Sequence, residues 1–203
     1  RPAGCGFLFR QHGHGFLVTA AHVAGHLQTV RFGVPASPVA AQEIFSIHGG
    51  VIMSAVGGDD VAVVSLDEAS IDGFREGGWL FLDENDLAPD HPCGPRRVFG
   101  WPHSLMTGRH DQGRLEEVHS VAVTFEANAV NGWDALKLFP ELRPGTAFDY
   151  FLAWPESPLP TEALNGISGS PIWVRRNQPI GRTLTPKQEL RLAGVVTAAS
   201  RAG

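Results

Sequence analysis

The chain has 203 residues, of which 43% are hydrophobic and 18% charged, with a formal net charge of −5. This composition excludes a disordered chain and suffices for one large domain or two small ones with hydrophobic cores. The negative balance, with no basic run longer than a pair, argues against nucleic acid as a partner, and no apolar stretch approaches the ~20 residues of a membrane span.

Short β-rich runs separated by turn residues fill the first part of the chain. Residues 6–9 and 15–19 predict a hairpin around the polar turn 11–14, and residues 20–27 predict one helical turn. The run 61–66 is apolar on both faces, as expected of a buried barrel strand. Further strands are expected over residues 29–34, 41–48, 51–56 and 60–66.

Residues 67–95 are rich in acidic residues, glycine and proline, and are interpreted as the connector between two halves. A second set of strands is expected over residues 97–100, 115–127, 147–153, 171–174 and 190–199. Few stretches have a helical period, and no internal repeat is found. Several short strands with turns between them indicate a sandwich or a barrel.

Three polar residues lie in settings that suit nucleophilic catalysis. Ser168 lies in a glycine-rich turn, His22 follows a strand, and Asp60 precedes an apolar strand. A serine hydroxyl is a weak nucleophile until a base takes its proton, and His22 can be that base. Asp60 can fix the tautomer of His22 and stabilise its imidazolium form. The N–H groups of Gly166 and Ser168 are expected to face an oxyanion.

The segments around these three residues resemble sequence motifs of the trypsin/chymotrypsin-like serine peptidases, and the chain is more similar to compact bacterial members than to secreted digestive ones. Residues 16–22, Phe-Leu-Val-Thr-Ala-Ala-His, resemble the family's histidine block. Residues 60–63, Asp-Val-Ala-Val, resemble its aspartate block, and residues 166–171, Gly-Ile-Ser-Gly-Ser-Pro, its serine block. Residues 194–197 are similar to a later strand that pairs with substrate backbone. The order histidine, aspartate, serine is that of the family.

This resemblance implies an all-β fold of two packed six-stranded antiparallel β-barrels, with the active site in the cleft between them. The first barrel, over residues 1–90, would carry His22 and Asp60. The second, over residues 91–203, would carry Ser168, the oxyanion hole and the specificity pocket. The implied activity is that of a serine endopeptidase that forms an acyl-enzyme on protein or peptide substrates, with no cofactor and no metal.

Substrate contacts are assigned by the same resemblance. Glu162 falls near the expected pocket floor, where a carboxylate would favour lysine or arginine side chains. The alternative is that Glu162 lies on a solvated loop. The substrate backbone is expected to pair with Thr197, Ala198 and Ala199 as an added strand.

Two positions depart from the family pattern. Ile167 stands where many members have the aspartate that receives a new N-terminal ammonium after zymogen cleavage. With Ile167 there, and with Arg1-Pro2 at the start, activation by N-terminal insertion is not expected. The pocket is then either preformed or ordered by an activating partner or a fused regulatory domain. Ser170 replaces a glycine, and this change is expected to be tolerated because the oxyanion donors are backbone groups.

Several alternatives stay open. The same residues suit a catalytically silent binding module, a protease that is inactive until regulated, or an esterase. Asp59 neighbours Asp60, and only one of them can face His22; Asp60 is favoured because it directly precedes the apolar run. His12 and His14 share a strand face, but two histidines are weak evidence for a metal, and an exposed turn is expected.

Cys5 and Cys93 are the only two cysteines. They are interpreted as free buried thiols, with a single disulfide as the alternative. So few cysteines favour a reducing compartment, which leans towards a cytoplasmic location. Neither cysteine lies next to a plausible base in the sequence, so a cysteine nucleophile is not expected.

Overall fold

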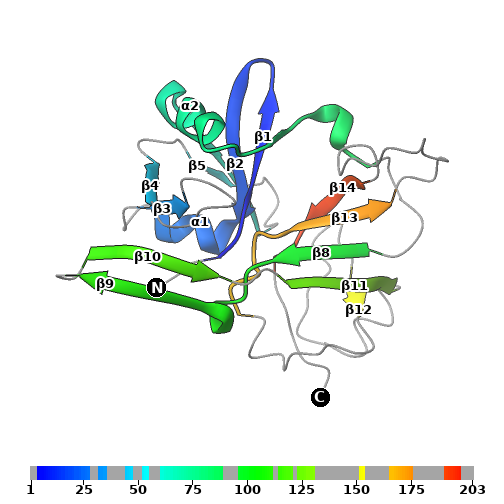
Figure 1. The fold of residues 1–203 in the computed structure, drawn as a ribbon. Coiled ribbons are helices and arrows are strands. Elements are labelled where there is room, and N and C mark those ends of the chain that lie inside the picture. Colours follow the sequence, from blue (N-terminus) through cyan, green and yellow to red (C-terminus); the bar gives the residue numbers. More distant parts are fainter. Residues whose placement is uncertain are drawn as a thin grey trace, which may run out of the picture.

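The computed structural model describes residues 4–27, 32–35, 44–47, 52–54, 60–88, 96–111, 114–120, 123–130, 151–153, 165–175 and 190–197. In these residues the protein is mostly β, with two five-stranded sheets, two two-stranded hairpins and few helices (Figure 1). The hairpins are β3 (Phe32–Pro35) with β4 (Ile44–Ile47), and β9 (Met106–Asp111) with β10 (Arg114–Ser120). The strand-rich composition predicted from the sequence is therefore observed.

The first sheet has the strand order β5-β6-β2-β1-β7. Its strands are β1 (Phe7–Gln11), β2 (His14–Ala20), β5 (Ile52–Ser54), β6 (Val61–Ser65) and β7 (Phe81–Leu82). The predicted β1–β2 hairpin is confirmed, with Leu8 opposite Leu17 and a turn at His12 and Gly13. All pairings are antiparallel except that of β1 with β7, which is parallel.

The segment predicted as a connector contains a helix that the sequence analysis did not expect. Helix α2 (Glu68–Glu76) begins at Asp67, whose side chain accepts a hydrogen bond from Ser70 N–H at 2.8 Å. Phe74 from this helix is buried with the apolar side chains of the first sheet and makes edge-to-face contact with Trp79 and Phe81. The helix thus closes one side of the core formed by Leu8, Leu17, Val64 and Leu66.

The second sheet has the strand order β12-β11-β8-β13-β14 and is antiparallel throughout. Its strands are β8 (Arg96–Gly100), β11 (Val123–Val130), β12 (Phe151–Ala153), β13 (Pro171–Arg175) and β14 (Leu190–Val195). Val98 is fully buried, and Ile172 lies opposite it in the register of β8 and β13. Among the described residues neither large sheet closes into a barrel.

One set of contacts between the halves joins the 3-10 turn η1 (Glu84–Asp86) and the residues after it to β14. Ala88 N–H donates to the Leu192 carbonyl at 2.7 Å, and Leu87 forms a parallel bridge with Leu192. The Arg191 guanidinium donates to the Asn85 carbonyl. The chain is thus fixed to the second sheet soon after it leaves the first. None of the described helices has the length and apolar character needed to cross a membrane.

Candidate active site

The pairing of β2 with β6 brings His22 and Asp60 together. Ala20 lies opposite Val61 in this register, so the residues just beyond them meet at the same end of the sheet. Helix α1 (Ala21–Leu27) starts there, and its first N–H, from Ala21, donates to the Asp60 carbonyl at 3.1 Å. Val23 on this helix is buried at 1% exposure, so the adjacent His22 side chain is left on the accessible face.

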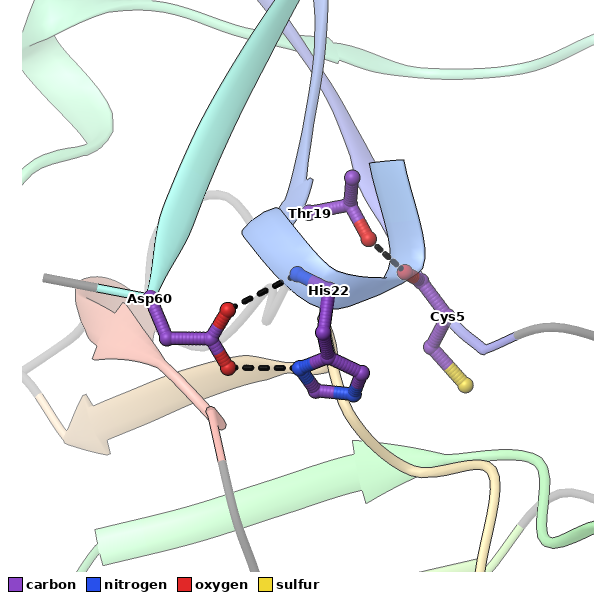
Figure 2. A network of polar contacts seen from close by, with 4 residues as sticks. All are labelled: Cys5, Thr19, His22 and Asp60. Atoms are coloured by element: carbon purple, nitrogen blue, oxygen red, sulfur yellow. Dashed lines mark hydrogen bonds and ion pairs between the residues drawn. The ribbon is translucent and has the colours of Figure 1, made fainter. Parts of the chain in front are cut away.

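Both carboxylate oxygens of Asp60 are used on His22 (Figure 2). Oδ1 accepts the His22 backbone N–H at 2.8 Å, and Oδ2 lies 2.5 Å from Nδ1 of the imidazole. An ionised carboxylate only accepts hydrogen bonds, so Nδ1 carries the proton and Nε2 keeps its lone pair. The ring is half exposed, at 51%, and can receive a proton from a neighbouring group.

The turn that carries Ser168 is fixed by glycines and by β14. Gly166 and Gly169 have φ values of +97° and +90°, where any other residue is strained. Ser170 N–H closes the turn on the Ile167 carbonyl at 2.9 Å. Gly169 N–H donates to the Val196 carbonyl at 2.7 Å, and Val196 N–H returns a bond to Ser170 at 2.9 Å. The main chain on both sides of Ser168 is therefore held by hydrogen bonds.

Ile167, which directly precedes Ser168, is 1% exposed. Its side chain is part of the apolar interior, where its Cβ and Cγ2 lie near Gly100. Burial of an unpaired carboxylate at this position would be strongly unfavourable, so the turn is built around hydrophobic packing.

This turn docks on the first sheet beside the helix that carries His22. Cys5 N–H donates to the Ser168 carbonyl at 2.7 Å. Thr19 Oγ1 donates to the Cys5 carbonyl at 2.6 Å (Figure 2). A Cβ added to Gly169 would overlap both the Cys5 carbonyl and the Thr19 hydroxyl. Because Thr19 lies three residues before His22, the nucleophile turn and the histidine helix share one neighbourhood. Within the described part of the chain, no hydrogen bond joins Ser168 Oγ to His22.

The two N–H groups predicted to hold an oxyanion have no partner among the described residues. Among the described residues, Gly166 N–H and Ser168 N–H make no hydrogen bond, although the carbonyls around them do. Asn165 O accepts from His103 N–H at 2.7 Å, and Gly166 O accepts from the Cys5 thiol at 3.1 Å. Unpaired N–H groups in a fixed turn are uncommon, and they supply the donors that an anionic oxygen requires.

Cys5 is a structural thiol. Burial raises its pKa, so the sulfur stays protonated and donates to Gly166 O while accepting Trp101 N–H at 3.4 Å. A neutral thiol in this position is a poor nucleophile, in line with its expected role. It is free of any disulfide, whereas Cys93 lies outside the described residues.

The remaining predicted site residues are only partly covered. Thr197 directly follows Val196 at the end of the second sheet and is partly buried. Glu162, Ala198, Ala199 and Asp59 lie outside the described residues. His12 and His14 are exposed at the β1–β2 turn, and no group of three or more His, Cys, Asp or Glu side chains suited to a metal occurs in the described segments.

Two residues that the sequence analysis did not identify contact the serine turn. They are Cys5 and His103, and both act on the carbonyls next to Gly166. Their contacts join positions far apart in the chain, so no local spacing in the sequence signals them. The close approach at Gly166, where a Cβ would overlap the His103 ring, is a second reason, besides its positive φ, that a glycine is required there.

Comparison with protein-family models and with curated proteins found no match for the chain. The arrangement joins an oriented imidazole, a partly exposed serine in a fixed turn and two N–H groups that have no partner among the described residues.

Proposed function

We propose that the protein is a serine endopeptidase of the trypsin/chymotrypsin-like kind. The two sheets would belong to two six-stranded β-barrels, over residues 1–90 and 91–203, with the substrate in the cleft between them. The observation that carries the proposal is the contact of both Asp60 oxygens with His22, which leaves Nε2 of the imidazole as a base. The docking of the Ser168 turn beside the same helix adds support.

In the proposed reaction Ser168 Oγ attacks the scissile carbonyl while His22 Nε2 takes its proton. Asp60 stabilises the resulting imidazolium through the Nδ1 hydrogen bond. The negative oxygen of the tetrahedral intermediate is held by Gly166 N–H and Ser168 N–H, each contributing about 3–4 kcal/mol. His22 then gives its proton to the leaving amine, and a water molecule repeats the steps to release the acyl group.

The substrate is proposed to bind as an extended strand along residues 197–199. Thr197 follows directly from Val196, which is bonded to Ser170 of the nucleophile turn, so a strand added there would run towards Ser168. Glu162 is proposed to give the pocket a preference for lysine or arginine.

A fluorophosphonate probe tests the proposal directly, because it reacts only with an activated serine. Wild type is expected to be labelled, and Ser168→Ala and His22→Ala are not. Ser170→Ala is the matched control: its hydroxyl is fully buried two residues from the nucleophile, and this variant is expected to label like wild type. A folded wild type that stays unlabelled would favour a binding module, and labelling of Ser168→Ala would refute the nucleophile.

Peptidase and esterase activity are separated by turnover. Hydrolysis of a peptide library together with p-nitrophenyl acetate supports the endopeptidase. Hydrolysis of the ester alone supports an esterase that uses the same three residues.

A further inference from the structure

His103 lies against the oxyanion turn and is bonded to it through its main chain. It begins the 3-10 turn η2 (His103–Leu105), which is closed by Leu105 N–H on the Pro102 carbonyl at 3.0 Å. The first N–H groups of a helical turn have no acceptor within it. The His103 N–H instead donates to the Asn165 carbonyl at 2.7 Å.

This hydrogen bond sets the direction of the next N–H group. A peptide unit is planar and trans, so its carbonyl and its N–H point in opposite directions. With the Asn165 carbonyl directed at His103, the Gly166 N–H of the same peptide points away from His103. A half-turn of this peptide would exchange the two groups, break the His103 bond and place a carbonyl oxygen where a donor is needed.

The next carbonyl is held as well. The Cys5 thiol donates to Gly166 O at 3.1 Å, so the peptides on both sides of Gly166 are fixed by donors from distant segments. The His103 imidazole fills the space next to the Gly166 Cα, where an added Cβ would overlap the ring. Its Nε2 is buried without a hydrogen-bond partner among the described residues, which leaves the main-chain N–H as the group that holds the turn.

We propose that His103 is a positioning residue that keeps the oxyanion hole formed in the free protein, through its main-chain N–H rather than its imidazole. The inference rests on the proposed serine hydrolase function. It further specifies regulation of that site: the oxyanion turn is ready without an activating partner.

Two substitutions separate the main chain from the side chain. His103→Ala keeps the N–H and removes the ring, whereas His103→Pro removes both and places a ring carbon against the Asn165 carbonyl. Proline suits the position, because the φ of a 3-10 residue is close to the value its ring imposes. Loss of one oxyanion donor predicts that His103→Pro reacts with the fluorophosphonate about 100-fold more slowly than His103→Ala.

Steady-state kinetics with p-nitrophenyl acetate distinguish positioning from a general loss of structure. His103→Pro is expected to lower kcat relative to His103→Ala with KM changed less than about twofold, since the oxyanion exists only beyond the ground state. If the wild type is active and the reaction rates of the two variants differ by less than about threefold, the inference is overturned. A folded wild type that does not react alone but reacts once an activating partner is added would overturn the inference and leave the proposed function standing. A folded wild type that reacts under neither condition would overturn the proposed function itself.

Amide hydrogen exchange on the wild type tests the same bond without any substitution. The His103 amide is expected to be protected, while the Gly166 and Ser168 amides exchange quickly. This measurement decides the matter if His103→Pro does not fold. A His103 amide that exchanges as fast as that of Gly166 would overturn the proposal.

Discussion

Replacing Asp60 by asparagine tests the central contact of the site, because neither orientation of the new amide can accept hydrogen bonds from both the backbone N–H and Nδ1 of His22. Asp60 accepts two hydrogen bonds, from His22 N–H and from Nδ1. If the amide NH₂ faces Nδ1, the imidazole must carry its proton on Nε2 and loses its capacity as a base. If the amide oxygen faces Nδ1, the NH₂ meets the backbone N–H donor at the 2.8 Å position.

The first orientation should therefore dominate. Leaving a donor without an acceptor costs about 1–3 kcal/mol. The orientation in which the amide oxygen faces Nδ1, which alone keeps Nε2 as a base, is therefore the less populated one. Loss of the negative charge also removes stabilisation of the imidazolium. Together these effects predict a fall in kcat of about 10⁴-fold, equivalent to about 5.4 kcal/mol in the activation free energy.

The assay is the rate of fluorophosphonate labelling alongside ester turnover, with folding checked by circular dichroism. Asp59→Asn is the matched control, as it removes the adjacent carboxylate that the sequence offers as an alternative, and it is expected to react like wild type. A rate for Asp60→Asn within about tenfold of wild type would refute the role given to Asp60. A large loss in Asp59→Asn alone would transfer the role to Asp59.

Three further predictions concern the support of the serine turn. Gly100→Ala is expected to lower the free energy of unfolding by about 1–3 kcal/mol, because the methyl would overlap the Ser170 hydroxyl. Addition of Ser170→Gly should recover part of that loss, and strictly additive effects in urea titrations would contradict the overlap. Burial raises the pKa of Cys5, so above about pH 9 the unfolded chain loses the thiol proton first, and stability falls by up to about 1.4 kcal/mol per pH unit. Cys5→Ala should reduce this fall of the free energy of unfolding with pH. An unchanged fall would contradict the raised pKa of the Cys5 thiol. Thr19→Val should lower the free energy of unfolding by about 1–3 kcal/mol, because it leaves the Cys5 carbonyl without its hydrogen bond. The exposed control Thr124→Val should lower it by less than about 0.5 kcal/mol.

Local patterns in the sequence predicted the first sheet well. The hairpin of β1 and β2 follows from two alternating runs around a polar turn, and β6 from its apolar character. Antiparallel pairing then has only one register that buries Leu8 and Leu17 while placing His22 next to Asp60. The meeting of these two residues was predicted from motif order, and the register is its physical cause.

Other features depend on contacts between residues far apart in the sequence, which no local sequence pattern predicts. Helix α2 contains Gly73 and several charged residues, so its segment resembles a loop, although Asp67 provides a cap and Phe74 an anchor. Strand β7 has only two residues, too few for a pattern of its own, and is defined by its parallel pairing with β1. The role of Cys5 likewise requires the second sheet to bring Gly166 within reach of its thiol.

The position of Ser168 relative to His22, the proposed nucleophile and base, is fixed by backbone packing. The segment 4–6 lies between the two: a Cβ at Gly4 would come within 2.6 Å of Val23 on the histidine helix and 2.8 Å of the Ser168 carbonyl. Cys5 N–H holds that same carbonyl, and Thr19 fixes Cys5. Substitution of Ser168 or Asp60 therefore removes chemistry and leaves this framework in place. A larger residue at Gly4 is instead expected to displace Ser168 relative to His22 and to leave the Asp60–His22 contact in place, so that any loss of rate would come from the changed distance.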